Sequence, residues 1–321
     1  MKIARYRPLN SEIERVGIVK NNSIRDLSLG YASLLTNKGN SHAYEEANIL
    51  ASPSLHRLIQ TGSNAWEVIK ATDDFIEKSN GEVKGPEGET VTYNLSAVKI
   101  LPPLPSLSNK IISLARNFVE HALGATGSGL PKRPAAFLKL PTSVIGPEDP
   151  IIYPSITQQL DYEVEIAAIV SDKVKDIKSS EALGHIFGYS IFNDISARDQ
   201  PDQVDSNFFF FGKNFDCSAP MGPWIVSPDE ISDPHSLDMI TRVNGETRQS
   251  GNSSNMARKF DEVFEYYSRD NTIYPGDIFT SGTPSGTGLE KKDGSWYLKP
   301  GDTLELEIEN IGILRNSVVK K

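Results

Sequence analysis

The sequence has little cysteine and no excess of positive charge, and each scarcity excludes some cellular compartments or binding partners. Cys217 is the single cysteine, so no disulfide can form within the chain, and a reducing cytoplasm is the expected compartment. The formal net charge is −9 and the pI is near 5.2. Nucleic acids and anionic membrane surfaces both require a basic face on a protein partner, so neither is an expected partner.

Long apolar runs are also missing. No segment approaches the run of about 18 apolar residues that a membrane span requires, and the first residues, MKIARYRPLN, lack the apolar core of a secretory signal. The 321 residues are 38% hydrophobic and 23% charged, which fits a soluble globular protein with one large or two ordinary domains.

A proline-rich segment, LPPLP at residues 101–105, predicts a domain boundary, because proline fixes its own φ and restricts the residue before it. Residues 1–105 are expected to form a small α+β domain, with short strands at 3–6, 16–19 and 23–27 and helices between 41 and 80. Residues 106–321 contain many short strands and turns but few helices. The sequence therefore predicts a mainly β, barrel-like or sandwich-like second domain in an α+β protein.

Three acidic residues suggest a metal site. In LDYEVEIAAIV (residues 160–170), apolar and acidic residues alternate, so on a strand Glu163 and Glu165 share one face about 6.6 Å apart. Two carboxylates so close repel each other unless a cation lies between them. Asp194, in GYSIFNDISARD, supplies a third oxygen if its strand lies alongside, and oxygen ligands favour Mg²⁺, Mn²⁺ or Ca²⁺. Spacing alone leaves open that the two glutamates form the solvated face of an ordinary strand.

Basic residues near this region are candidates for catalysis, namely His121 and Lys213, and for binding a substrate, namely Lys139. His121 precedes a glycine-rich segment, residues 124–134, which predicts a mobile loop over a site. A histidine there is a candidate general base, although this pattern on its own is more often that of an ordinary surface histidine. Lys139 and Lys213 are embedded in apolar sequence, where a lysine either extends outward to water or pairs with an anion in a pocket.

Two further residues are candidates for binding a substrate. Arg198 can hold a carboxylate in a bidentate contact, or it can pair with Asp199 or Asp202. Thr283 lies in TSGTPSGTG, which lacks the Gly-Lys-Ser/Thr of a phosphate-binding loop. This loop either presents Thr283 and backbone N–H groups to a small carboxylate or is a plain hairpin connection.

Taken in order, seven segments resemble the fumarylacetoacetate hydrolase family. They cover residues 111 to about 312 almost continuously: ISLARNFVEHA, AFLKLPTSVIGP, LDYEVEIAAIV, GYSIFNDISARD, GKNFDCSAPMGPWIV, VNGETRQSGN and PGDIFTSGTPSGTG. The resemblance implies a mixed β-roll core, usually dimeric and binding Mg²⁺ or Mn²⁺, with the small N-terminal domain of many bacterial members. Such proteins hydrolyse, decarboxylate, dehydrate or isomerise 2-oxo acids and 1,3-dicarbonyl compounds.

The resemblance also implies roles for individual residues. Glu163, Glu165 and Asp194 match the metal ligands, and Lys213 matches the active-site lysine. The remaining matches are the lid histidine, the arginine of the Ser-Ala-Arg-Asp motif and the substrate-contacting threonine, here His121, Arg198 and Thr283.

The chain departs from the family pattern at three positions. Relatives that hydrolyse acylpyruvates commonly pair the histidine with a glutamate three residues later, where this chain has Gly124. Pro201 stands where relatives often have glutamine, with Gln200 and Gln203 as alternatives. Phe118 stands where many relatives have tyrosine.

These residues lead to three hypotheses about function. The first is metal-dependent hydrolysis of a C–C bond in a 2,4-dioxo acid, with His121 activating water and the metal stabilising an enolate product. The second is a lyase or isomerase acting on a 2-oxo acid: oxaloacetate decarboxylation, dehydration of a 2-keto-3-deoxy sugar acid, or isomerisation of the 2-hydroxyhepta-2,4-diene-1,7-dioate type. Gly124 favours it because an unoriented His121 activates water poorly. The third is a binding protein that lost catalysis, although its ligand carboxylates and Lys213 are present.

Overall fold

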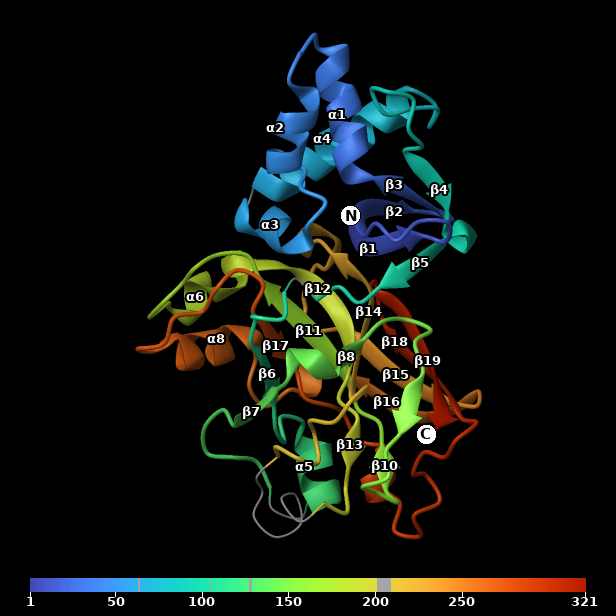
Figure 1. Cartoon of the computed structure of the whole chain (residues 1–321). Helices are drawn as coiled ribbons and strands as arrows, with labels where there is room; N and C mark the ends of the chain where they lie inside the picture. Colours follow the sequence, from blue (N-terminus) through green and yellow to red (C-terminus); the bar gives the residue numbers. More distant parts are fainter. Residues whose placement is uncertain (63, 105, 127–128, 201–208) are drawn as a thin grey trace.

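The computed structural model describes residues 1–321 except 63, 105, 127–128 and 201–208. Strands predominate over helices, and parallel and antiparallel pairings both occur, which confirms the predicted α+β fold with mixed sheets. The first hundred residues lie at the top of Figure 1 and the remainder below them. Among the described residues no helix combines the length and apolar character needed to cross a membrane.

A large sheet runs through the whole molecule. Within the described residues its twelve strands are β1 (Lys2–Pro8), β2 (Arg15–Lys20), β3 (Ser23–Asp26), β4 (Thr92–Asn94), β5 (Val98–Leu101), β6 (Ile111–Leu114), β7 (Ala136–Lys139), β8 (Val144–Ile145), β11 (Val164–Val170), β12 (Ile186–Asn193), β14 (Ala219–Val226) and β17 (Ile278–Thr280). Their order is β4-β3-β2-β1-β14-β12-β11-β17-β6-β7, with β5 paired to β1 and β8 to β14.

The predicted N-terminal strands are present, and one helix, over residues 27–37, precedes the region between 41 and 80 where helices were expected. The strand predicted at residues 23–27 ends at Asp26, because the Asp26 carboxylate accepts a hydrogen bond from Leu29 N at 2.8 Å and caps a helix there. The described helices are α1 (Leu27–Asn37), α2 (Ala43–Leu50), α3 (Leu55–Gln60), α4 (Asn64–Lys78), α5 (Val119–Thr126), α6 (Ser179–Ala182) and α8 (Phe260–Ser268).

The two parts of the chain share one sheet and one hydrophobic core. Strand β1 pairs with β14, with Lys2 opposite Val226. One buried cluster contains Ile18 from the first part together with Ile169 and Phe192 from the second. The N-terminal part therefore shares a sheet and a buried cluster with the second part, and the domain division at residue 105 stays a prediction.

A second sheet packs against the lower part of the first. Its strands are β9 (Ile151–Tyr153), β15 (Asp238–Val243), β16 (Glu246–Asn252), β18 (Thr303–Ile308) and β19 (Gly312–Lys320), in the order β16-β15-β18-β19-β9. Met239 and Leu306 from this sheet share a buried cluster with Ile166 and Ile191 of the large sheet. A short pair is formed by β10 (Leu160–Asp161) and β13 (Ser196–Ala197).

Two predicted segments differ in extent from the structure. The strand expected over residues 160–170 is interrupted, because β10 and β11 belong to different sheets. Between β11 and β12 the chain forms α6 and a 3-10 helix, η3 (Leu183–His185), before Ile186 begins the buried strand β12. The loop expected from residue 124 begins later, because α5 continues to Thr126; residues 127–128 lie outside the described part. The other 3-10 helices are η1 (Leu95–Ala97), η2 (Pro141–Ser143), η4 (Pro228–Glu230), η5 (Ser253–Asn255) and η6 (Gly288–Glu290).

Candidate active site

The three predicted metal ligands lie together where two central strands meet. Strand β11 runs antiparallel to β12 with Val164 opposite Asn193, so Glu163 immediately before β11 lies beside Asp194 immediately after β12. The amide of Asp194 donates to Glu163 O at 3.0 Å. One oxygen from each of Glu163, Glu165 and Asp194 lies within 4.8 Å of the others, and all three residues are buried. The alternative of a solvated strand face is therefore wrong.

These carboxylates fit a divalent cation. Among the described residues, Oε2 of Glu165 is buried with no hydrogen-bond partner. Burial, together with the nearby charges of Asp194 and Glu163, raises the pKa of Glu165 well above its ordinary value. An acidic oxygen that is buried, unpaired and adjacent to two other carboxylates is the arrangement that Mg²⁺ or Mn²⁺ satisfies.

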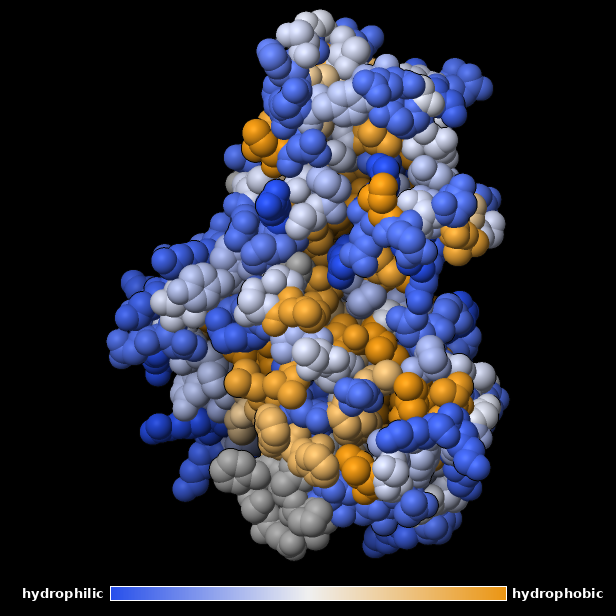
Figure 2. Space-filling model, in the orientation of Figure 1, coloured by the Kyte–Doolittle hydropathy of each residue, from blue (hydrophilic) through white to orange (hydrophobic). Residues whose placement is uncertain are grey.

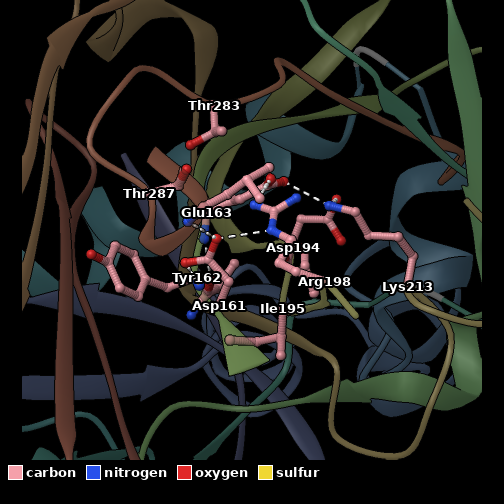
Figure 3. A network of polar contacts seen from close by, with 12 residues as sticks. Asp161, Tyr162, Glu163, Asp194, Ile195, Arg198, Lys213, Thr283 and Thr287 are labelled. Carbon is pink, nitrogen blue, oxygen red and sulfur yellow. Dashed lines mark hydrogen bonds and ion pairs between the residues drawn. The ribbon is translucent and has the colours of Figure 1, made fainter. Parts of the chain in front are cut away.

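Lys213 lies between two of the carboxylates. Its Nζ is 2.8 Å from Glu163 Oε2 and 2.6 Å from Asp194 Oδ2, as Figure 3 shows. Burial alone would lower the pKa of Lys213, but Asp194 and Glu163 raise it above its ordinary value, so the ammonium stays charged. The ion pairs do not exclude a metal, because each carboxylate oxygen has two lone pairs and can accept a second contact.

Lys139 is more deeply buried than the sequence suggested. Its side chain is 0% exposed, and Nζ pairs with Asp194 Oδ1 at 2.8 Å while donating to Ser218 O at 2.8 Å. Outward extension to water is wrong for both Lys139 and Lys213. The ammonium of Lys139 already faces Asp194 and backbone carbonyls. This geometry favours a role in holding Asp194 in place, rather than the predicted contact with a substrate.

Arg198 pairs with different acids from those expected. Its Nε donates to Asp161 Oδ2 at 2.8 Å and its Nη2 to Glu163 Oε1 at 2.5 Å (Figure 3). Asp199 instead accepts from Gln158 N at 2.9 Å, and Asp202 lies outside the described residues. Contact between Arg198 and a substrate carboxylate stays a prediction.

His121 is buried and held by a carboxylate that the sequence did not reveal. The residue is 6% exposed, so the surface-histidine alternative is wrong. Its Nδ1 lies 2.8 Å from Oε1 of Glu290 in η6, 169 residues further along the chain, and its Nε2 lies 4.0 Å from Glu163 Oε1. Burial would raise the pKa of Glu290, but the hydrogen bond with His121 helps to lower it. The expectation that Gly124 leaves His121 unoriented is therefore wrong.

Thr283 lies on the loop that leads from β17 to η6. This loop is not a hairpin connection, since η6 rather than a strand follows it. Gln249 Nε2 donates to Thr283 Oγ1 at 2.8 Å and also to Pro284 O, and Figure 3 shows Thr283 and Thr287 on the Glu163 side of the cluster. Substrate contact by Thr283 stays a prediction.

The structure describes some of the positions at which the chain departs from the family pattern. Gln200 is one of the two alternatives to the missing glutamine. Its side-chain amide donates a hydrogen bond to Ile156 O and is therefore already engaged within the protein. Pro201 and Gln203 lie outside the described residues. Phe118 is 1% exposed and belongs to the main core, so its ring packs where a tyrosine hydroxyl would require a partner.

Comparison with known proteins now decides the family. Residues 110–319 match the family described as "Fumarylacetoacetate (FAA) hydrolase C-terminal". The chain belongs to the fumarylacetoacetate hydrolase family. The match includes every residue of the carboxylate cluster and the basic residues around it.

Similar proteins in this family include two oxaloacetate tautomerases and a fumarylacetoacetate hydrolase of known structure. The oxaloacetate tautomerase YisK of Bacillus subtilis is 39% identical over 267 residues, which cover 83% of this chain and 86% of the relative. The mitochondrial oxaloacetate tautomerase FAHD2A of Homo sapiens is 37% identical over 224 residues, 70% of each chain. The solved fumarylacetoacetate hydrolase of Exiguobacterium antarcticum is 31% identical and covers 100% of both chains, with a TM-score of 0.75.

Proposed function

We propose that this protein is an enzyme dependent on Mg²⁺ or Mn²⁺ that interconverts the keto and enol forms of oxaloacetate or a closely related 2-oxo acid. Its similarity to two oxaloacetate tautomerases supports this substrate class. The observation that carries the proposal is the placement of His121, whose Nδ1 is held by Glu290 while Nε2 lies on the side of Glu163. A tautomerase requires such a base beside a site that withdraws electrons.

Glu163, Glu165 and Asp194 would hold the metal. A divalent cation bound there would supply Lewis acidity, which would make the C–H bond next to the 2-oxo group more acidic. Among the described residues, the cations of Lys139, Arg198 and Lys213 pair with Asp161, Glu163 and Asp194. None of these ion pairs includes Glu165, whose carboxylate a metal would compensate.

The protein residues would move and stabilise the proton. Because the carboxylate of Glu290 only accepts hydrogen bonds, His121 presents Nδ1–H to it and keeps Nε2 free as the base. Nε2 would remove the proton from C3 of the keto acid and pass it to the 2-oxo oxygen to give the enol, and both transfers would be reversed in the other direction. The ammonium of Lys213 would stabilise the negative oxygen that develops, in a buried site where water screens charge weakly.

Hydrolysis of a 2,4-dioxo acid is a second candidate, and one observation favours it. Glu290 gives His121 the orienting carboxylate that Gly124 withholds, so the same Nε2 is suited to activating a water molecule. The third hypothesis, a binding protein without catalysis, has less support, because both the acidic cluster and an oriented histidine are present.

Two substrates separate the candidates. With Mg²⁺, the purified protein should accelerate conversion of freshly dissolved enol-oxaloacetate to the keto form, followed by ultraviolet absorbance, and leave acetylpyruvate intact by NMR. Glu165→Ala should abolish the metal-dependent rate. Release of pyruvate and acetate from acetylpyruvate without any tautomerase rate would instead establish the hydrolase, and a wild-type rate in Glu165→Ala would contradict the metal site.

We also propose that the protein is a cytoplasmic homodimer. Several large apolar side chains are exposed on β7, directly after it, and in the segment before Lys213: Leu138, Leu140, Phe210 and Phe211. Figure 2 shows apolar surface gathered on the lower half of the molecule. A second copy is the expected cover for such a surface; light scattering that gives the mass of one chain would contradict it.

A further inference from the structure

We infer that Asp161 is a positioning residue that holds Arg198 and the η6 turn at the same time, and through them orients Glu163 and His121. This inference rests on the proposed function and extends it to a residue for which the sequence indicated no role.

The Asp161 carboxylate is saturated with donors. The residue is 0% exposed. Oδ1 accepts hydrogen bonds from Tyr162 N at 2.9 Å and Gly288 N at 2.6 Å. Oδ2 accepts from Arg198 Nε at 2.8 Å and Leu289 N at 3.1 Å. Both oxygens are fully used by protein groups, so Asp161 acts through its partners rather than on a substrate.

One set of contacts reaches the metal-binding carboxylates. Arg198 donates from Nε to Asp161 and from Nη2 to Glu163 Oε1, as the dashed lines of Figure 3 indicate in part. The guanidinium is planar and its donors have fixed directions, so holding Nε also fixes where Nη2 points. Asp161 thereby determines the orientation of one oxygen of Glu163.

The other set of contacts reaches the base. Gly288 and Leu289 donate their backbone amides to Asp161, and the next residue is Glu290, which holds His121 Nδ1. A Cβ atom at Gly288 would lie only 2.7 Å from Asp161 Oδ1. The turn therefore approaches the carboxylate as closely as a glycine permits, and its position depends on that contact.

Asparagine cannot replace Asp161 in this role. All four described partners are donors, two on each oxygen. The NH₂ group of an asparagine would face donors in either orientation, and at least two hydrogen bonds would be lost. Asp161→Asn thus changes the contacts with almost no change in side-chain shape.

Asp277 provides a matched control far from this network. It is also buried, and it accepts from the backbone amides of Lys110 and Tyr274 at 2.9 Å each. Asp277→Asn should lower stability in a similar way, without any contact to Arg198 or η6. A purely structural role for Asp161 predicts the same behaviour for both variants.

The experiment measures the tautomer of the His121 imidazole directly by NMR. In protein labelled with ¹⁵N-histidine, the His121 signals are assigned among the five histidines by His121→Asn. Wild type and Asp277→Asn should show the single Nδ1–H tautomer, and Asp161→Asn a mixture. At saturating Mg²⁺, Asp161→Asn should lower kcat about tenfold or more, with KM changed less than about threefold. An unchanged His121 spectrum in folded Asp161→Asn would overturn the inference.

Two further measurements keep the inference testable. If Asp161→Asn does not fold, Gly288→Ala displaces the same turn while leaving Asp161 in place, and the same mixture of tautomers is expected; a wild-type spectrum again overturns the inference. The NMR result does not require turnover. A protein inactive on oxaloacetate that still shows the tautomer change in Asp161→Asn would retain the positioning role and refute only the proposed reaction.

Discussion

The carboxylate of Glu290 lies directly beside Gly124: a Cβ atom at Gly124 would be 3.4 Å from Glu290 Oε2. Positions 121 and 124 are three residues apart on α5 and so share a face of the helix. The space that a side chain at position 124 would take is thus adjacent to the carboxylate that holds His121. A glutamate on the helix, as in the relatives that the sequence resembles, and Glu290 on η6 are two ways to supply the same acceptor.

Glu290→Ala should lower kcat about 10- to 100-fold, the usual cost of losing a residue that orients a functional side chain. The double variant Glu290→Ala with Gly124→Glu should recover part of that loss, because the new carboxylate lies one helical turn from His121. Steady-state kinetics on enol-oxaloacetate measure both. Equal activity of Glu290→Ala and wild type would show that Glu290 does not orient the base.

Metal binding should release a proton from Glu165. Without metal, burial and the charges of Asp194 and Glu163 raise its pKa well above the ordinary value, so the group retains a proton at pH values where a free glutamate has lost it. A metal binds the carboxylate form, and apparent affinity should therefore rise with pH and weaken as pH falls.

Titration calorimetry with Mg²⁺ in two buffers of different ionisation enthalpy counts the released protons. Glu165→Gln serves as the control, since it has no proton to release and should bind Mg²⁺ weakly. Identical binding enthalpies for wild type in both buffers would contradict this account.

Lys139→Met should destabilise the protein by about 3 kcal/mol, toward the low end for breaking a buried ion pair, since it removes one of the two cations that pair with buried Asp194 and leaves only Lys213. Mg²⁺ should restore more stability to this variant than to wild type, because the metal compensates the same carboxylate. Thermal unfolding with and without Mg²⁺ measures the difference. Lys110→Met, which removes the partner of buried Asp277 at 2.5 Å, should show no such extra gain.

Local patterns predicted the carboxylate cluster because its geometry is local. Alternation within residues 160–170 places Glu163 and Glu165 on one face, and a neighbouring antiparallel strand brings Asp194 to them. The same alternation gave no indication that Asp161 is buried, because period-two spacing does not reveal whether the polar face is covered. In the structure η6 covers Asp161.

Long-range partners could not be predicted in this way. Glu290 lies 169 residues from His121, and nothing in the spacing of either segment indicates the contact. For Arg198 the sequence offered nearby acids, but the chain direction after β13 brings Asp161 and Glu163 to it instead. An acidic residue close to an arginine in sequence is therefore not a reliable prediction of its ion-pair partner, because a reversal of chain direction can bring a more distant acid closer.

Trp66 should stabilise the whole chain, although it lies in the N-terminal part. Its ring stacks on Phe187 of β12 with centroids 5.0 Å apart, and its Nε1 donates to Phe187 O at 2.9 Å. Since β12 leads to Asp194, this contact ties helix α4 to the strand that precedes a proposed metal ligand. Trp66→Ala should lower the free energy of unfolding by about 3 kcal/mol, toward the low end for a large aromatic residue that is only partly buried.

Chemical denaturation followed by fluorescence and by circular dichroism tests this expectation. A single shared transition at lower denaturant is expected for Trp66→Ala, because the two parts share one sheet and core. Trp296→Ala is the control: this half-buried ring lies beside Arg248 and Lys291, and its loss should cost less than about 1 kcal/mol. Two separate transitions, with the second unchanged from wild type, would mean that residues 1–105 unfold alone and that the predicted boundary is also a boundary of cooperative unfolding.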